Sequence, residues 1–181
     1  MTRQRLDRFD NRQFVRGRSA LVEALWLVVQ GWLFASDLPG SGWRRLLLRW
    51  FGAEIGQGVV IKPRVRVKFP WRLQIGDHAW IGEAVWIDNL ARVEIGAHAC
   101  VSQGAYFCTG NHDWRREDFA LRTEPIVVGA HAWVGAMAQL APGATLADGA
   151  ILAMGSRLSG NTAPDRLYAG CPATDQGPRQ R

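Results

Sequence analysis

The sequence predicts a mainly β protein: a parallel β-helix of hexapeptide repeats, with an N-terminal helical segment and one extended loop. Three observations predict this fold class. Bulky apolar residues recur with a spacing of six, glycine follows many of them, and one interval of the repeat is longer than the others. A period of six fits neither a helix nor an amphipathic strand. It fits a coil of three short strands, each of which turns one apolar residue inward.

The first element is a basic segment over residues 1–53. Residues 1–50 hold nine arginines against four acidic residues, a net charge of +5, whereas the remaining 131 residues hold thirteen basic and twelve acidic residues. Because the body of the chain is almost neutral, a nucleic-acid groove along it is not expected. The hydrophobic content of 48% and the charged content of 21% also exclude a wholly disordered chain.

Apolar residues between Ser19 and Ser36 follow helical spacing, and a second short amphipathic stretch covers residues 43–51. Two compatible interpretations are open. The helices cap the open end of the β-helix and pack on neighbouring subunits, or they form an interfacial helix with arginines facing lipid headgroups, which gives a peripheral membrane contact through residues 1–50. A membrane span is disfavoured, because the stretch is barely long enough and contains Glu23.

The repeat covers residues 54–160. Three groups of apolar positions begin at Ile55, Ile75 and Ile95, so each coil has 20 residues, and the spacing of six continues strictly from Val128 to Leu158. Stacked coils expose strand edges only at the two ends of the β-helix. The helices suit one end, and the tail over residues 161–181 suits the other end or a neighbouring subunit.

The interruption lies between Ile95 and Val128, and its excess of thirteen residues falls in a loop over about residues 109–124. His112, in the sequence TGNHDW, is the one histidine outside a regular corner of the repeat. A neutral imidazole accepts a proton from a hydroxyl group at neutral pH, and Asp113 or a main-chain carbonyl would fix its tautomer. His112 is therefore a candidate general base, with a hydrogen-bonded loop histidine as the alternative.

The other three histidines, His78, His98 and His131, share one corner position of the repeat. A stack of imidazoles about 4.8 Å apart suggests a metal site. Metal ligands must converge from different directions, however, so we expect turn residues in left-handed backbone and no metal. The three cysteines have neither an even number nor ligand-like spacing, which favours a reducing cytoplasm over a disulfide framework.

Three stretches are specific enough to indicate a family. They are the run from IGDHAWIGEAVWIDN to CTGNHDW, the PIVVGAHAWVG after the loop, and the closing YAGCPA. Together they resemble the hexapeptide-repeat O-acetyltransferases, which include the maltose, galactoside and nodulation-factor enzymes, and above all the colanic-acid-biosynthesis acetyltransferases. The resemblance covers residues 20–173. It implies a left-handed β-helix and a cytoplasmic homotrimer that binds acetyl-CoA, its co-substrate, between two subunits.

The resemblance also implies roles for individual residues, with His112 as the general base. The residues it places at the acceptor are Asp88, Asn89, Asn111, Asp113 and Trp114. The residues it places at the donor are Ala136, Met154, Ser159 and Gly160, with Arg157 added for the CoA phosphates. Many relatives carry a basic residue in place of Gly160 and of Thr174, so Arg157 or Arg179 would take over that role. The alternative for Asp88 is a corner residue that caps a turn.

The function predicted from these features is O-acetyl transfer from acetyl-CoA to a hydroxyl of a sugar or lipid-linked oligosaccharide, of the exopolysaccharide-biosynthesis type. The hydroxyl attacks directly, without an acyl-enzyme, in the cytoplasm or at the inner face of the membrane. Two alternatives use the same fold: a metal-dependent hydratase of the γ-carbonic-anhydrase type, and a non-catalytic β-helical scaffold. Nothing in the sequence identifies the acceptor.

Overall fold

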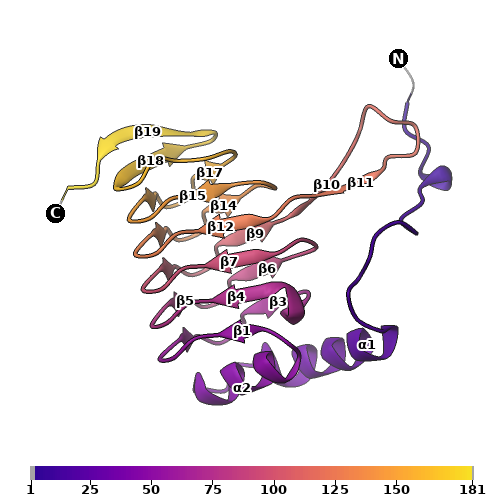
Figure 1. Cartoon of the computed structure of the whole chain (residues 1–181), viewed down its shortest axis with the longest axis horizontal. Helices are drawn as coiled ribbons and strands as arrows, with labels where there is room; N and C mark the ends of the chain where they lie inside the picture. Colours follow the sequence, from indigo (N-terminus) through magenta and orange to yellow (C-terminus); the bar gives the residue numbers. More distant parts are fainter. Residues whose placement is uncertain (1–2, 181) are drawn as a thin grey trace.

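The computed structural model describes residues 3–180, which form a three-sided prism of stacked coils with helices across one end (Figure 1). Each side is a sheet of parallel strands, one strand from each coil, and the second sheet also contains the antiparallel strand β19 (Ala173–Pro178) at its end. The strands of the first sheet are β1 (Glu54–Ile55), β4 (Leu73–Ile75), β7 (Val93–Ile95), β12 (Ile126–Val128) and β15 (Thr145–Leu146). Those of the second are β2 (Val60–Ile61), β5 (Trp80–Ile81), β8 (Cys100–Val101), β13 (Trp133–Val134), β16 (Ile151–Leu152), β18 (Arg166–Gly170) and β19 (Ala173–Pro178). Those of the third are β3 (Arg66–Val67), β6 (Trp86–Asp88), β9 (Tyr106–Cys108), β14 (Gln139–Leu140) and β17 (Arg157–Leu158).

The strand register confirms the six-residue repeat. In the first sheet Ile55 pairs with Ile75, Ile75 pairs with Ile95, and Ile95 pairs with Val128 across the interruption. The corresponding residues of the other two sheets pair in the same way, and all of them are buried. Two positions before these residues a second residue is also buried, and in the second sheet it is often a small one such as Ala79. The core therefore contains two inward-facing columns on many strands, where the sequence predicts one.

The corners show why the repeat uses glycine and histidine. A Cβ atom on Gly76 would lie 2.5 Å from the main-chain nitrogen of Ala97 in the next coil, so only glycine fits there. His78, His98 and His131 have φ values of 57–58°, which confirms that they are turn residues in left-handed backbone. Their rings stack with centroids 5.3 and 5.0 Å apart. They form a column rather than converging on a point, and residues 3–180 contain no cluster of three or more His, Cys, Asp or Glu side chains suited to a metal ion.

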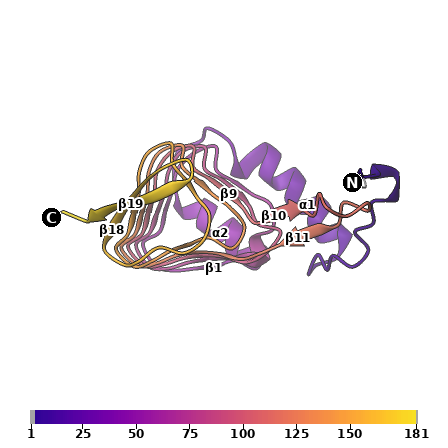
Figure 2. The same cartoon turned by 90° about the horizontal axis from the view of Figure 1, so that it is seen from above.

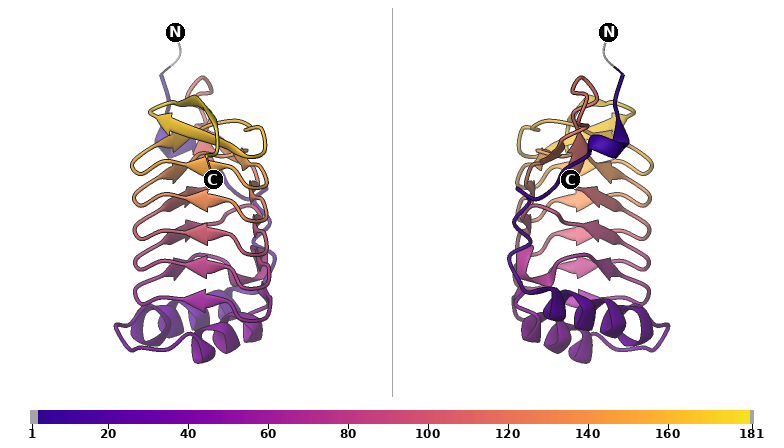
Figure 3. Two further views of the ribbon diagram at one scale, coloured as in Figure 1. Left: turned by 90° about the vertical axis from the view of Figure 1, so that its left-hand side faces the viewer. Right: turned by 90° about the vertical axis from the view of Figure 1, so that its right-hand side faces the viewer.

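Two helices cover the first coil, as the capping interpretation predicts (Figures 1 and 3). Helix α1 (Ala20–Val29) continues directly into a π-helical turn, η2 (Gln30–Phe34), and α2 (Gly42–Trp50) follows. The Ser19 hydroxyl caps α1 by accepting a hydrogen bond from the main chain of Val22, 3.4 Å away. No helix within residues 3–180 has the length and apolar character needed to cross a membrane.

Side chains from these helices satisfy the strand edges of the first coil. The Trp26 indole donates to the carbonyl oxygen of Val67 (2.7 Å), at the edge of the third sheet. The Ser41 hydroxyl accepts from the Ile61 main-chain nitrogen (3.0 Å), and the Arg49 guanidinium donates to the carbonyl oxygen of Ile55 (2.7 Å). The first strand of each of the three sheets therefore forms a hydrogen bond with a side chain of the cap. This bond pairs a backbone group that would otherwise be unpaired at the edge of the sheet.

Arg44 holds the cap itself together. Its side chain is fully buried and donates to the carbonyl oxygens of Phe34 (3.1 Å), Ser36 (2.7 Å) and Gly40 (2.7 Å), which link η2 to α2. Burial lowers the pKa of the Arg44 guanidinium. The three carbonyl groups stabilise its charge in a place where water cannot.

At the opposite end the segment over residues 161–180 adds strands to the second sheet. Strand β18 pairs in parallel with β16, and β19 folds back antiparallel onto β18. This hairpin covers the last coil at its second side.

The interruption in the repeat is a second antiparallel hairpin, which projects sideways from the prism (Figures 1 and 2). Its strands are β10 (Gly110–His112) and β11 (Leu121–Thr123), with His112 opposite Leu121. The N-terminal strap, residues 3–18 with the short helix η1 (Leu6–Arg8), runs from this hairpin down to α1. The sequence predicts only a basic segment there, whereas the structure shows that this segment connects the hairpin to helix α1.

Candidate active site

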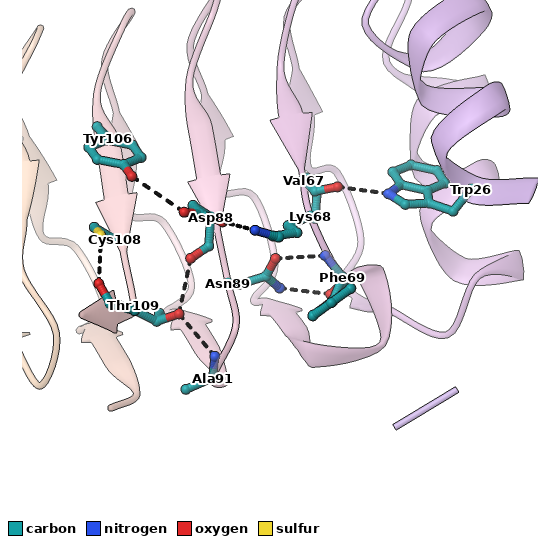
Figure 4. A network of polar contacts seen from close by, with 11 residues as sticks. Trp26, Val67, Lys68, Phe69, Asp88, Asn89, Ala91, Tyr106, Cys108 and Thr109 are labelled. Atoms are coloured by element: carbon teal, nitrogen blue, oxygen red, sulfur yellow. Dashed lines mark hydrogen bonds and ion pairs between the residues drawn. The ribbon is translucent and has the colours of Figure 1, made fainter. Parts of the chain in front are cut away.

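The site lies at the corner between the third and first sheets, where the first three coils are longer than three hexads. The first coil makes a short helix there, η3 (Pro70–Arg72), and the third coil makes the β10–β11 hairpin. At this corner β6 and β9 of the third sheet end in Asp88 and Cys108, and Lys68 directly follows β3, in neighbouring coils (Figure 4). Chemically active side chains therefore form a ladder at the base of the hairpin.

His112 is half-buried between two aromatic rings. Its imidazole stacks on Phe119 of the same hairpin, with ring centroids 4.3 Å apart and planes 4° apart, and Phe9 of the strap contacts it edge-on at 5.4 Å. His112 Nδ1 lies 2.8 Å from the carbonyl oxygen of Phe119. A carbonyl oxygen only accepts hydrogen bonds, so this contact assigns the proton to Nδ1 and leaves the Nε2 lone pair free.

The strap holds the hairpin from outside. The Arg5 main-chain nitrogen donates to the carbonyl oxygen of Glu117 (2.7 Å), and the Arg8 guanidinium pairs with the Glu117 carboxylate (2.7 Å). Further down, the Trp71 indole donates to the carbonyl oxygen of Arg16 (2.8 Å). The position of Phe9 over His112 therefore depends on contacts along the whole strap.

Asp113 does not orient the imidazole. Its carboxylate is buried, pairs with Arg122 at 2.5 Å and accepts from the main-chain nitrogen of Arg115 (3.1 Å), so it stabilises the hairpin. Of the two tautomer-fixing groups considered from the sequence, the structure provides the carbonyl, that of Phe119. Trp114 lies exposed on the hairpin beside Arg115.

Asp88 and Asn89 lie one coil below His112 and play different parts (Figure 4). The half-buried Asp88 carboxylate lies 3.1 Å from Lys68 Nζ and accepts from the Tyr106 hydroxyl at 3.4 Å. Asn89 is fully buried, and its amide makes two hydrogen bonds with the main chain of Phe69, at 2.9 and 2.7 Å. Asp88 can therefore reach a ligand, whereas the buried Asn89 amide is engaged with the main chain of Phe69.

Two residues that the sequence analysis did not select support Asp88. Burial raises the pKa of Tyr106, and hydrogen bonding with Cys108 and the charge of Asp88 raise it further, so the phenol stays protonated and donates to the carboxylate. Thr109 is buried and bonds both the carbonyl oxygen of Asp88 (3.0 Å) and the main-chain nitrogen of Ala91 (2.9 Å). Tyr106 and Thr109 lie one coil after β6, and this place in the repeat is the sequence signal that could have revealed them.

A groove of about 750 Å³ opens beside Asp88, between the third sheet and the helices. One wall carries Arg66, Lys68 and Trp86, and the opposite wall is formed by Leu27 and Gly31 of the α1–η2 helix. The groove thus combines cationic, aromatic and apolar surface at the predicted acceptor residue.

The predicted donor residues fall in more than one place. Ala136 and Met154 line a mostly apolar groove of about 540 Å³ at the corner between the second and third sheets. Arg157 lines a smaller pocket of about 260 Å³ that also contains Asn111, next to His112. Ser159 and Gly160 are exposed after β17 and border neither of these.

Arg179, the second candidate for the CoA phosphates, is engaged elsewhere. Its guanidinium donates to the carbonyl oxygens of His131 (3.0 Å) and Gly149 (2.9 Å), at the corner between the first and second sheets. Arg157 is the candidate that lies near the hairpin.

Known proteins share both the sequence and the fold. The chain is 44% identical over 120 residues to WcaF of Escherichia coli, which is named as a colanic acid biosynthesis acetyltransferase, and this alignment spans 66% of each chain, just under two thirds. It is 27% identical over 142 residues to nodulation protein L of Rhizobium meliloti, and this alignment spans 75% of this chain and 77% of that protein. No protein-family model matches the chain.

A solved structure extends the similarity to almost the whole chain. The hexapeptide-repeat acetyltransferase VCA0836 of Vibrio cholerae matches with a TM-score of 0.79 and 26% identity, covering 90% of this chain and 95% of that one. The same protein has also been solved with acetyl-CoA bound, and that structure matches with a TM-score of 0.80. The repeat, the fold and these similarities together show that the chain is similar in sequence and in structure to hexapeptide-repeat acetyltransferases.

Proposed function

We propose that the chain transfers an acetyl group from acetyl-CoA to a hydroxyl group of a sugar or lipid-linked oligosaccharide, with His112 as the general base. The observation that carries this proposal is the contact between His112 Nδ1 and the Phe119 carbonyl oxygen, because it leaves Nε2 ready to accept a proton. The name of WcaF supports exopolysaccharide biosynthesis as the setting, and the acetyl-CoA complex of VCA0836 supports the donor.

In the proposed reaction His112 Nε2 takes the proton of the acceptor hydroxyl as its oxygen bonds to the thioester carbonyl carbon. The carbon–sulfur bond then breaks, and the CoA thiolate leaves and recovers the proton from the imidazolium, so that CoA and the acetyl ester are the products. Asp88 and Trp86 orient the sugar in the groove beside the third sheet. Ala136 and Met154 contact the donor. We place the reaction in the cytoplasm, where acetyl-CoA is available.

The test of the reaction uses the purified chain, acetyl-CoA and a panel of neutral sugars and lipid-linked glycans. We expect release of free thiol that requires an acceptor, together with the mass of one acetyl group on that acceptor. Absence of transfer to every acceptor, combined with no acetyl-CoA binding by calorimetry, would overturn the proposal.

We also propose that the active form is a homotrimer, as the family resemblance implies. The support comes from the second sheet, whose outward-facing residues form one apolar column. In register, its members are Val60, Trp80, Cys100, Trp133, Ile151 and Leu167. The outward column of the first sheet is polar instead, with Glu54, Gln74 and Glu94 in register. A continuous apolar column of this kind is typical of a protein–protein interface.

Substituting Trp133→Glu would place a charge in the middle of this column. We expect the wild-type chain to have three times the mass of one 20.1 kDa chain by light scattering, and the variant to dissociate. Thr145→Glu, on the outward side of the first sheet, is the control and should keep the trimeric mass. A wild-type chain with the mass of one subunit would refute the trimer.

A further inference from the structure

The helical cap exposes an apolar stripe at the base of the prism. Helix α1 and η2 turn Trp26 and Phe34 into the core. The opposite side consists of Leu21, Leu25, Val28 and Trp32, all exposed, with Leu21 at 79% and Trp32 at 86%. Their spacing of four, three and four residues places them on one helix face. A helix that packs one apolar side on the core and exposes a second apolar side is expected to contact another apolar environment with the exposed side.

Helix α2 adds to the same end of the molecule. Leu46 and Trp50 are one helical turn apart and exposed, Trp50 at 71%. Both helices lie across the base, and all coils of the prism lie on their other side (Figure 3). We name the set of six residues on the two helices the basal apolar surface.

A layer of positive charge lies directly above the basal apolar surface. The first coil, residues 54–73, contains five basic residues and one acidic residue, whereas the second coil, residues 74–93, contains one basic and three acidic residues. Lys62 and Arg66 of the first coil are exposed, and no carboxylate in residues 3–180 lies within 4.0 Å of either. Arg66 lines one groove with Leu27 and Gly31 of the α1–η2 helix, and Lys62 follows Ile61, whose main-chain nitrogen donates to Ser41 at the start of α2, so both cations belong to the part of the prism next to the helices.

The arginines of α2 do not form this layer. Arg44 is buried, and Arg45 and Arg49 donate to carbonyl oxygens of the first coil. The other six arginines before the β-helix, at positions 3, 5, 8, 12, 16 and 18, belong to the strap and not to α1 or α2. Apart from the strap, the cations that can face an anionic surface therefore come from the β-helix.

We propose that the base of the prism docks on a lipid bilayer with anionic headgroups. The basal apolar surface enters the boundary between headgroups and acyl chains, to a depth of about 5–10 Å, and the cations of the first coil meet the phosphates. Tryptophans at the two ends of the surface, Trp32 and Trp50, suit that boundary.

Charge favours a bilayer over a second copy of the chain. Two copies joined base to base would bring two basic first coils together, which costs energy, whereas anionic headgroups neutralise them. The groove at Asp88 also borders the helix, through Leu27 and Gly31. If the proposed function holds, a bilayer-anchored acceptor would enter the site from this side.

Vesicle flotation with the purified full chain tests the proposal without any assay of acetyl transfer. We expect the chain to float with phosphatidylcholine vesicles and to bind at least tenfold more tightly when about a third of the lipid is phosphatidylglycerol. The variant Leu25→Glu/Trp32→Glu should bind both vesicles at least tenfold more weakly. The variant Lys62→Gln/Arg66→Gln should lose only the preference for phosphatidylglycerol.

The matched control is Leu6→Glu/Trp114→Glu, which places the same two changes on the exposed strap and hairpin. It should bind as the wild type does, and far-UV circular dichroism melts should show that all variants are folded. A wild-type chain that floats with neither vesicle, or a control that weakens binding as much as the basal variant, would refute the proposal. So would base-to-base association without vesicle binding, seen as a mass above the trimer that Leu25→Glu/Trp32→Glu abolishes.

Discussion

Replacing His112 by alanine or glutamine should lower kcat/KM for acetyl transfer by about a hundredfold or more, the usual effect of losing a general base. The Phe119 carbonyl oxygen 2.8 Å from Nδ1 fixes the ring so that Nε2 accepts the hydroxyl proton, and neither substituted side chain can accept it. Acetyl-CoA affinity should change little, since the substitution leaves Ala136 and Met154, the residues proposed to contact the donor, unchanged. Steady-state kinetics by thiol release, with calorimetry for the donor, measure both quantities.

The control for this variant is His131→Ala. His131 belongs to the stack of corner histidines, has a left-handed backbone conformation and has no proposed part in the reaction. The control variant should keep activity within about twofold, because it leaves the hairpin untouched. A His112→Ala variant with more than a tenth of the wild-type activity would show that another group accepts the proton.

Replacing Arg44 by methionine should lower the free energy of unfolding by about 3 kcal/mol or more. Methionine fills most of the space but leaves the carbonyl oxygens of Phe34, Ser36 and Gly40 without their donor, and each buried unpaired group costs about 1–3 kcal/mol. Arg45→Met, one residue along the same helix, removes a single bond to the carbonyl oxygen of Val59 and should cost only about 1 kcal/mol.

Urea unfolding of both variants at one protein concentration measures the difference, since association couples stability to concentration. Arg44→Lys should recover only part of the loss, because one ammonium group cannot match three carbonyl groups spread around a planar guanidinium. Equal losses for Arg44→Met and Arg45→Met would show that the cap does not depend on the buried guanidinium.

The repeat could be predicted from sequence because its period leaves few geometric choices. A bulky residue at every sixth position must point inward if three short strands close a coil, so Ile55, Ile75 and Ile95 pair as their spacing requires. The hand of the coil does not follow from this argument, and the family resemblance supplied it. The small inner column, such as Ala79, was missed because alanine is common on surfaces as well.

The candidate site was predicted less completely, for physical reasons that differ between residues. His112 could be found because the loop breaks a regular repeat. Asn89 carries the same chemical groups as a sugar-binding amide, and only the structure shows that the amide is fully buried and bonded to the main chain of Phe69. The donor residues lie on more than one face, and no spacing within one chain indicates how a second subunit would bring them together.

The strap has a consequence for how the chain acquires its structure. In a solenoid each coil contacts mainly its neighbours, so coils can form in order as the chain is synthesised. The strap breaks this order, because Arg8 pairs with Glu117, 109 residues later. The strap leaves the ribosome before the hairpin does, so it must wait for the hairpin before it can dock. Phe9 reaches the imidazole only then, so a segment that is made before the β-helix is among the last to reach its place.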